Sequence, residues 1–291
     1  MERFPNVSSA QVENDKLQIS DKEFQQLSKL IYKEAGINLS DNKKSLVISR
    51  LRTRLSTLGL GSFSEYYDKV LNDETGTELS VLLDAISTNV TSFFREYNHF
   101  EFLQDTVIPE LTEQYNTSRE RSYIHWWSSA SSTGQEPYSM AISWLESVDR
   151  PARYNFKLLA TDISNPALEE AREAVYQEKE LSKINPATKN QYFTKARDYG
   201  SGYYKVCQPV RDLVTFGRLN LNQNRFPFDR KFDLIFCRNV TIYFDQPIVQ
   251  KLINKFERNL KSGGYLFMGH SESLAGIDSG LSFIEPTIYQ K

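Results

Sequence analysis

The hydrophobic positions in the first third of the chain follow a helical period. Phe24, Leu27 and Ile31 recur every three or four residues, which predicts an amphipathic helix. Ser20 and Glu23 precede them with the spacing of a capping box, in which each side chain accepts a hydrogen bond from the other residue's backbone amide. Three more stretches show the same period, namely residues 46–58, 63–72 and 78–87. This part of the chain therefore predicts a small all-helical domain.

The pattern changes after residue 120 into strands that alternate with helices. The strand-like runs are residues 123–131, 156–164, 232–240, 265–270 and 283–291, and the helical runs between them are residues 136–147, 165–176 and 246–260. This alternation predicts an α/β domain with a parallel, Rossmann-like sheet that carries helices on both faces. Residues 190–218 contain three glycines and several aromatic and β-branched residues without a helical period. We predict a small antiparallel β insertion there.

Composition narrows the class of protein. A chain of 291 residues suggests about two domains, and 40% hydrophobic with 25% charged residues predicts a packed core. The formal net charge of -2 argues against nucleic-acid binding, which requires a basic excess. No apolar run approaches the ~18 residues of a membrane span, and the polar N-terminus lacks the apolar middle of a secretory signal. Two cysteines and three separated histidines favour a reducing cytoplasm and no metal site.

The first candidate ligand segment is WSSASSTGQEPYS, residues 127–139. It leads from a predicted strand through small residues into a predicted helix, and ligands of doubly wound folds bind at this junction. Small residues let the backbone approach a ligand closely. Because Gly134 is its one glycine, the segment does not match GxGxxG and gives little support to dinucleotide binding, and it is not a GxxxxGK[ST] phosphate loop. The alternative is a strand-to-helix turn with a Ser or Thr cap.

Asp162 closes the second predicted strand of this region. An acid at that position can accept hydrogen bonds from the hydroxyls of a ribose. The alternative role for Asp162 is the N-cap of the helix that begins near Asn165.

Two further polar segments are candidates for a site. In residues 87–96, polar residues and Arg95 flank an aromatic pair and could line a cleft; the alternative is a helix start with a buried aromatic pair. In residues 236–244, Arg238 and Asn239 end a buried strand and Tyr243 follows. A buried charge without a partner is unfavourable, so Arg238 needs one; the alternative is a surface turn with Arg238 in a salt bridge.

Together these segments resemble the chemotaxis receptor methyltransferases, the CheR family. After the helical domain, the family's motifs follow in order as TNVTSFFRE, WSSASSTGQEPYS, ATDI, RLNL, FCRNVTIYF and GHSESL, so that the resemblance covers about residues 20–290. Ser129 and Ser131 depart from the family loop, which usually has alanine or glycine and then cysteine. The resemblance implies a class I methyltransferase sheet, S-adenosylmethionine as cofactor with S-adenosylhomocysteine as product, and methylation of glutamates on chemoreceptor signalling helices in sensory adaptation.

The same resemblance implies which residues form the site. The cofactor-binding residues would be Asn89, Thr91, Arg95, Glu136, Asp162, Asn220, Leu221, Arg238 and Asn239. Arg95 and Tyr243 would lie nearest the methyl group as catalytic residues. Since a glutamate side chain has an ordinary pKa of ~4.3, it is already a nucleophile at neutral pH. The enzyme would then align the reactants without a general base.

Two regions are candidates for receptor recognition. The second helix carries a group of basic residues with Asp41 as the only acid in residues 41–60, and we expect this group to dock the receptor; it consists of Lys43, Lys44, Arg50, Arg52 and Arg54. The alternative is a solvated basic face. The β insertion matches a family subdomain that in some members binds a peptide from the receptor's C-terminus by strand addition, although its loop ARDYGSGYYKV looks short for this.

We expect a cytoplasmic monomer that does not insert into a membrane. The expected organisation is a flexible leader (1–20), a helical domain (21–90), a linker with a connecting helix (91–120) and the methyltransferase domain (121–291). Two other functions remain open. The chain could be a non-catalytic, cofactor-binding regulatory scaffold, or a methyltransferase for another protein or a small molecule.

Overall fold

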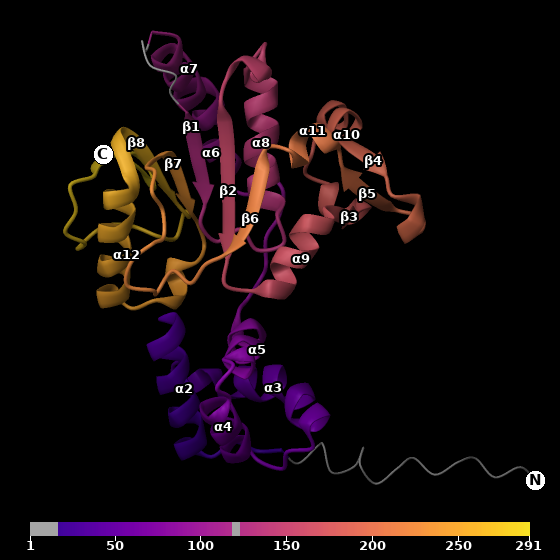
Figure 1. Ribbon diagram of the computed structural model, residues 1–291, viewed down its shortest axis with the longest axis vertical. Coiled ribbons are helices and arrows are strands. Elements are labelled where there is room, and N and C mark those ends of the chain that lie inside the picture. The colour runs from indigo at the N-terminus through magenta and orange to yellow at the C-terminus, as the bar shows by residue number, and fades with distance from the viewer. Residues whose placement is uncertain (1–16, 118–122) are drawn as a thin grey trace, which may run out of the picture. The chain divides into compact units, whose positions relative to one another are not determined.

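The computed structural model describes residues 17–117 and 123–291 (Figure 1). The predicted flexible leader therefore lies outside the described residues, apart from its last four. The chain divides into two compact units, Met1–Thr88 and Asn89–Lys291. Among the described residues, no helix combines the length and the apolar character needed to cross a membrane.

The first unit is all-helical, as predicted. Its elements are α2 (Asp21–Ala35), the short 3-10 helix η2 (Asp41–Lys43), α3 (Lys44–Leu58), α4 (Phe63–Asn72) and α5 (Thr77–Ile86). The capping box forms, because the Ser20 hydroxyl accepts from the Glu23 amide at 3.3 Å and the Glu23 carboxylate accepts from the Ser20 amide at 2.9 Å. Phe24, Leu27 and Ile31 are buried in the core of the unit. The helical period of the sequence therefore marked the buried face.

The second unit is built on a mostly parallel, seven-stranded sheet. Its strands are β1 (Ile124–Ser128), β2 (Phe156–Asp162), β6 (Val214–Arg218), β7 (Phe232–Cys237), β8 (Leu260–Met268), β9 (Ser282–Glu285) and β10 (Ile288–Gln290). The strand order is β6-β2-β1-β7-β8-β10-β9. The first five strands in this order are parallel, whereas β10 and β9 pair in antiparallel fashion. The predicted α/β class is confirmed.

Helices cover both faces of this sheet (Figure 1). The main ones are α6 (Tyr97–Phe102), the π-helix η3 (Leu103–Val107), α7 (Ile108–Thr117), α8 (Gln135–Ser147), α9 (Asn165–Glu173) and α12 (Gln246–Asn259). Trp126 packs into a core with α6, α7 and α8, while its neighbour Trp127 packs into a second core with α12. This alternation follows from the two-residue period of a strand.

A small antiparallel sheet follows α9 in the chain. It consists of β3 (Val175–Gln177), β5 (Tyr203–Val206) and β4 (Phe193–Lys195) in that spatial order, with α10 (Pro186–Tyr192) and the short α11 (Gln208–Arg211) near it in sequence. The predicted insertion is confirmed in kind, but its position differs from residues 190–218. The small sheet begins at Val175, and Val214–Arg218 is the parallel edge strand β6, which pairs with β2.

One other local expectation was wrong. Residues 283–291 form a hairpin of β9 and β10 around Pro286 and Thr287, because a proline cannot donate to a ladder inside a strand. The helix predicted over residues 246–260 is confirmed as α12, which ends one residue earlier at Asn259.

Candidate functional site

The carboxyl ends of four neighbouring strands meet at one edge of the large sheet. Since β2, β1, β7 and β8 are parallel and adjacent, the turns that follow them lie side by side. These turns are residues 129–134, 163–164, 238–243 and 269–272. Three of the four segments singled out in the sequence lie in or directly next to these turns.

The loop after β1 is tied to the end of β2. The Asp162 carboxylate accepts hydrogen bonds from the amides of Ser132 at 2.8 Å and Ser164 at 2.9 Å. Ser164, not Asp162, is the N-cap of α9, so the alternative role for Asp162 was wrong. The loop ends at Gly134 with φ 98°, where an added Cβ would lie 2.8 Å from the Tyr176 hydroxyl. Only glycine fits this close approach.

Arg238 lies in a buried network of charged groups. Its side chain is 1% exposed and donates to Glu96 Oε2 at 2.9 Å and to Glu136 Oε2 at 3.2 Å. It also donates to the carbonyl of Arg95. The partner that a buried arginine requires is thus a pair of acids, and the alternative of a surface turn was wrong.

The pKa values of the two acids in this network shift in opposite directions. Burial raises the pKa of Glu136, and the Arg238 charge only partly opposes this; Glu136 also accepts from the Ser128 hydroxyl at 2.7 Å. For Glu96, burial raises the pKa, but the hydrogen bond and charge of Arg238 outweigh burial and lower the pKa to about 2. Glu96 is therefore the permanently ionised partner of Arg238.

Asn239 adopts a left-handed backbone with φ 58°, a region in which asparagine is enriched. Its side-chain amide donates to Glu96 Oε1 at 3.1 Å, and its backbone amide donates to Glu272 Oε2 at 2.7 Å. Glu96 and Glu272 were not identified from the sequence, although both lie in quoted motifs. The signal for both was an acid next to a strand end or an aromatic pair, where burial requires partners.

The segment that opens the second unit packs against the same turns. The Asn89 carbonyl accepts from the Ser132 hydroxyl at 3.1 Å, and the Phe94 amide donates to the Ser139 hydroxyl at 2.9 Å. Arg95 donates to the Val90 carbonyl at 3.1 Å, and no acid of the described residues pairs with it. Its guanidinium is therefore available to a carboxylate.

Thr91 and Tyr243 are half-buried and lie next to residues of this network in sequence. Within the described part of the chain, neither side chain has a hydrogen-bond partner. Tyr243 ends the 3-10 helix η7 (Thr241–Tyr243), which directly follows Asn239 and Val240. The Tyr243 hydroxyl can therefore form a hydrogen bond with a ligand, because no group of the described residues bonds to it.

Asn220 and Leu221 follow β6 and lie near the end of β2. The Leu219 amide donates to the Asp162 carbonyl at 2.9 Å. Lys255 of α12 stabilises this loop. Its ammonium donates to the carbonyl of Leu221 and, at 2.8 Å, to the carbonyl of Gln223. Burial lowers the pKa of Lys255 to about 8.

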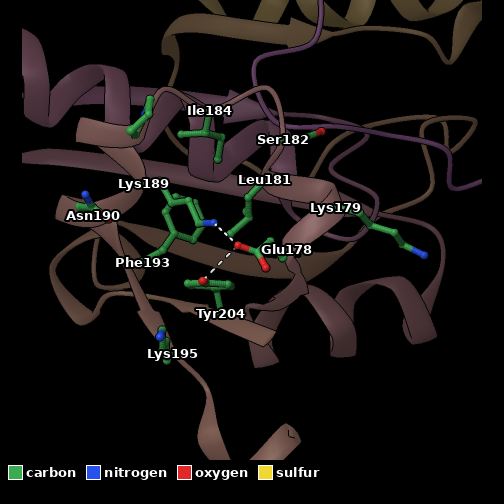
Figure 2. A pocket seen from close by; sticks show the side chains of 11 residues that line it. Glu178, Lys179, Leu181, Ser182, Ile184, Lys189, Asn190, Phe193, Lys195 and Tyr204 are labelled. Atoms are coloured by element: carbon green, nitrogen blue, oxygen red, sulfur yellow. Dashed lines mark hydrogen bonds and ion pairs between the residues drawn. The ribbon is translucent and has the colours of Figure 1, made fainter. Parts of the chain in front are cut away.

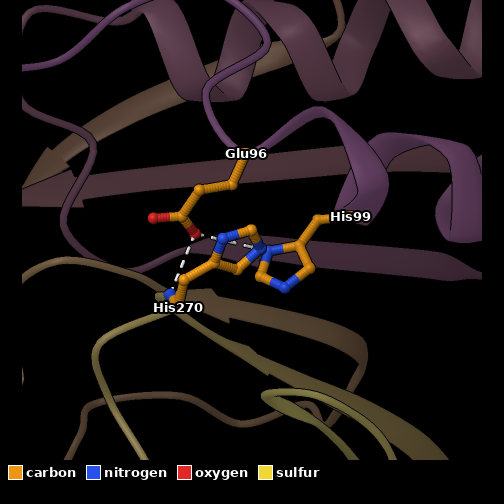
Figure 3. A group of neighbouring side chains, drawn as sticks. All are labelled: Glu96, His99 and His270. Atoms are coloured by element: carbon orange, nitrogen blue, oxygen red, sulfur yellow. Dashed lines mark hydrogen bonds and ion pairs between the residues drawn. The ribbon is translucent and has the colours of Figure 1, made fainter.

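Glu96, His99 and His270 form a group that resembles a metal site in its donor atoms, which lie within 4.8 Å of one another (Figure 3). However, Glu96 Oε2 already accepts from Arg238 and from the His270 amide at 3.1 Å, and its other oxygen accepts from Asn239. A metal ion would have to compete with the buried Arg238 charge for the same oxygen. Burial lowers the pKa of His99 to about 3, which makes it a neutral side chain packed against this network.

The predicted docking residues of the first unit do not all present free charges. Lys44 pairs with Asp21, and Arg54 donates to the buried Glu78 at 2.9 Å. Arg50 is exposed and donates to the Ser87 carbonyl at 3.1 Å, and Arg52 is half-buried. Lys43 of η2 is exposed. Arg54 therefore stabilises the helical unit, and the exposed charge of this group is concentrated at Lys43 and Arg50.

Comparison with known proteins gives consistent matches for both units. A family model described as "CheR methyltransferase, SAM binding domain" matches residues 89–289, and one described as "CheR methyltransferase, all-alpha domain" matches residues 22–87. The chemotaxis protein methyltransferase of Borreliella burgdorferi is 41% identical over 96% of this chain and 97% of its own. The probable chemotaxis protein methyltransferase of Rhizobium etli is 42% identical over 85% and 91%. Among solved structures, an S-adenosylmethionine-dependent methyltransferase from Mesorhizobium loti is 16% identical, with a TM-score of 0.30 over 57% of this chain and 54% of that chain.

Proposed function

Because the chain belongs to the CheR methyltransferase family and is thus an S-adenosylmethionine-dependent methyltransferase of chemotaxis, we propose that it forms methyl esters on glutamate side chains of chemoreceptors. The observation that carries this proposal is the meeting of Asn89, Asp162 and the Arg238–Glu136 pair around adjacent strand ends. Ligands bind at such an edge in open α/β sheets.

The residues at this edge fit the cofactor. The buried Ser131 hydroxyl, in the loop after β1, has no partner among the described residues. A buried polar group of this kind favours a ligand that can satisfy it. Asp162 is in the position of an acid that accepts from ribose hydroxyls. We propose that S-adenosylmethionine is held by the nine residues named from the family motifs, with Arg238 acting through Glu96 and Glu136.

The bound cofactor supplies a methyl group on a positively charged sulfur. The receptor glutamate attacks as a carboxylate, so the protein need not remove a proton from it. Burial raises the pKa of Cys237, the nearest thiol in the motif, well above its ordinary value, which makes it unsuited to act as a base. Arg95 and Tyr243 have side chains without acidic partners and would orient the incoming carboxylate by hydrogen bonds. Alignment of two reactants can lower a barrier by ~7–11 kcal/mol.

The acceptor is tested by methylating a receptor cytoplasmic fragment with radiolabelled S-adenosylmethionine. We expect the label to be released as methanol by mild alkali, because esters are hydrolysed and methylamines are not. Label that survives alkali would reject a glutamate ester.

Arg95→Ala should lower turnover at least 10-fold more than it weakens cofactor binding measured by calorimetry. Unchanged turnover in the folded variant would remove Arg95 from the mechanism.

We further propose that the exposed basic groups of the first unit dock the receptor. Lys43 and Arg50 retain exposed charges, and complementary charge mainly accelerates association. Lys43→Glu combined with Arg50→Glu should slow receptor methylation and flatten its salt dependence while cofactor binding stays intact. Lys22→Glu combined with Lys29→Glu changes two exposed lysines on α2 and is the matched control. Equal effects of both changes would exclude a specific docking surface.

The small sheet is the candidate site for a receptor C-terminal peptide. It borders a cavity of about 670 Å³ lined by apolar groups such as Phe193 and by lysines (Figure 2). At its centre the Glu178 carboxylate accepts from Lys189 at 2.8 Å and from Tyr204 at 3.2 Å. Fluorescence anisotropy with a labelled receptor C-terminal peptide tests this proposal, and Lys195→Glu should weaken the binding of a peptide with a free carboxylate. Absence of binding at millimolar concentration would reject the tether.

A further inference from the structure

Glu272 is a buried acid that the proposed reaction does not use directly. It follows β8 in the GHSES motif and is 4% exposed. No lysine, arginine or histidine of the described residues pairs with it. A buried carboxylate needs partners, so its hydrogen bonds indicate what holds it there.

The partners of Glu272 are backbone amides of the turn after β7. Its Oε1 accepts from the amides of Val240 (2.9 Å), Thr241 (2.7 Å) and Ile242 (3.3 Å), and from the Thr241 hydroxyl (2.8 Å). Its Oε2 accepts from the amides of Asn239 (2.7 Å) and Gly269 (2.6 Å). One side chain thus satisfies four consecutive amides of another segment about 30 residues earlier in the chain.

The amides converge because of the backbone of this turn. Asn239 has φ 58° and Val240 has φ -124° with ψ -34°, and such a succession turns neighbouring N–H groups to one side, where they form a concave anion site. The first amides of η7 would otherwise lack partners, as at the start of any helix. The carboxylate therefore stabilises a conformation that asparagine tolerates but does not strongly prefer.

The turn after β8 is pressed against this turn. A Cβ added to Gly269 would lie 2.6 Å from Glu272 Oε2 and 2.9 Å from the Asn239 nitrogen. The glycine therefore permits the approach on which the hydrogen bonds of Glu272 depend.

We propose that Glu272 is a positioning residue for methyl transfer. The four amides belong to the residues that connect Asn239, on the cofactor side, with Tyr243, on the acceptor side. Glu272 sets the distance and orientation between these two side chains without contacting either reactant. The inference rests on the proposed function, since it assumes the roles of Asn239 and Tyr243.

The expected effect is large because misplacement of about 1 Å can reduce turnover by about 100-fold. In Glu272→Ala, five amides lose their acceptor and a space the size of a small carboxylate remains. We expect turnover to fall about 100-fold and affinity for S-adenosylmethionine to fall less. Sodium formate, added at high concentration, should occupy the space, accept from the same amides and restore turnover at least 10-fold.

The matched control is Asp233→Ala. Asp233 is also buried and lies near the start of β7, the strand that precedes the turn held by Glu272. Its carboxylate accepts from the His125 amide at 2.8 Å and from Lys261 at 2.7 Å. Its removal should lower the melting temperature without any recovery of turnover by formate. Sodium chloride of equal ionic strength controls for salt, and wild-type enzyme should not respond to formate.

The outcomes separate the possibilities. Wild-type turnover in a folded Glu272→Ala variant would overturn the proposal, as would a loss of turnover that formate leaves unchanged. If Glu272→Ala does not fold, Glu272→Gln takes its place, because it keeps the shape and one acceptor; normal turnover in that variant would overturn the proposal. If wild-type enzyme does not methylate the receptor fragment, the proposed function fails instead, and calorimetry of S-adenosylmethionine binding with and without formate still tests Glu272.

Discussion

Replacement of Arg238 by methionine tests the buried charge network directly. The substitution keeps an unbranched side chain but removes the cation that bonds Glu96 at 2.9 Å and Glu136 at 3.2 Å. At an effective dielectric constant of about 20, each attraction at these distances amounts to about 5–6 kcal/mol before desolvation is subtracted. Measured losses on removing one partner of a buried pair are about 3–5 kcal/mol. We expect this loss in Arg238→Met, out of a total stability of about 5–15 kcal/mol.

Urea unfolding followed by tryptophan fluorescence measures this loss in the second unit alone. The three tryptophans of the chain, Trp126, Trp127 and Trp144, are all fully buried there. Burial already raises the pKa of Glu136, and loss of Arg238 would raise it further. The carboxyl group can then escape the penalty by binding a proton, so the loss of stability should be smaller at pH 5 than at pH 8.

The matched control is Arg258→Met, which removes an exposed arginine of α12 that has no ion pair among the described residues. It should change the free energy of unfolding by less than about 0.5 kcal/mol. A loss below about 1 kcal/mol for Arg238→Met at pH 8, or a loss of equal size at both pH values, would refute the reasoning.

Two further predictions concern the same site. The pKa of Glu96 is lowered from 4.5 to about 2, so the stability that its carboxylate contributes is complete above about pH 4.5 and is lost as the pH falls towards 2. In Glu96→Gln, the free energy of unfolding should therefore fall less steeply between pH 5 and pH 2 than in the wild type. An unchanged pH dependence in this range would contradict the assignment. Gly134→Ala places a Cβ 2.8 Å from the Tyr176 hydroxyl at φ 98°. We expect a loss of about 1–3 kcal/mol in the free energy of unfolding and weaker S-adenosylmethionine binding by calorimetry. The control Gly61→Ala, with no atom within 4 Å of the added Cβ, should have neither effect.

Regular elements were predictable because their signals are local. The helical period placed Phe24 and Leu27 in the core, and the capping box marked the start of α2. The strand Phe232–Cys237 is buried along its whole length, as its apolar run, interrupted only by Asp233, indicated. Elements with weak local signals were placed less well. Val214–Arg218 looks like part of the insertion from its residues alone, and only its pairing with β2 makes it a strand of the large sheet.

The candidate site was predictable only in part. The motifs pointed to Asp162, Arg238 and Asn239, which lie at adjacent strand ends. Their partners were not predictable, since Glu96 lies 142 residues from Arg238 and Glu272 lies 33 residues from Asn239. For the basic group of the first unit, the sequence showed the charges but did not show that Arg54 pairs with Glu78.

The amino-acid sequence by itself determined the class of fold, the main helices and strands, and the motifs of a methyltransferase family. Each of these depends on residues that are neighbours in the chain, whose periodicity and size decide local hydrogen bonding and burial. The tertiary structure decided which acid neutralises Arg238, which carboxylate satisfies the amides after Asn239, and which edge strand completes the sheet. These depend on the order and register of parallel strands, which bring distant residues to one edge and leave buried charges and amides only a few partners within reach.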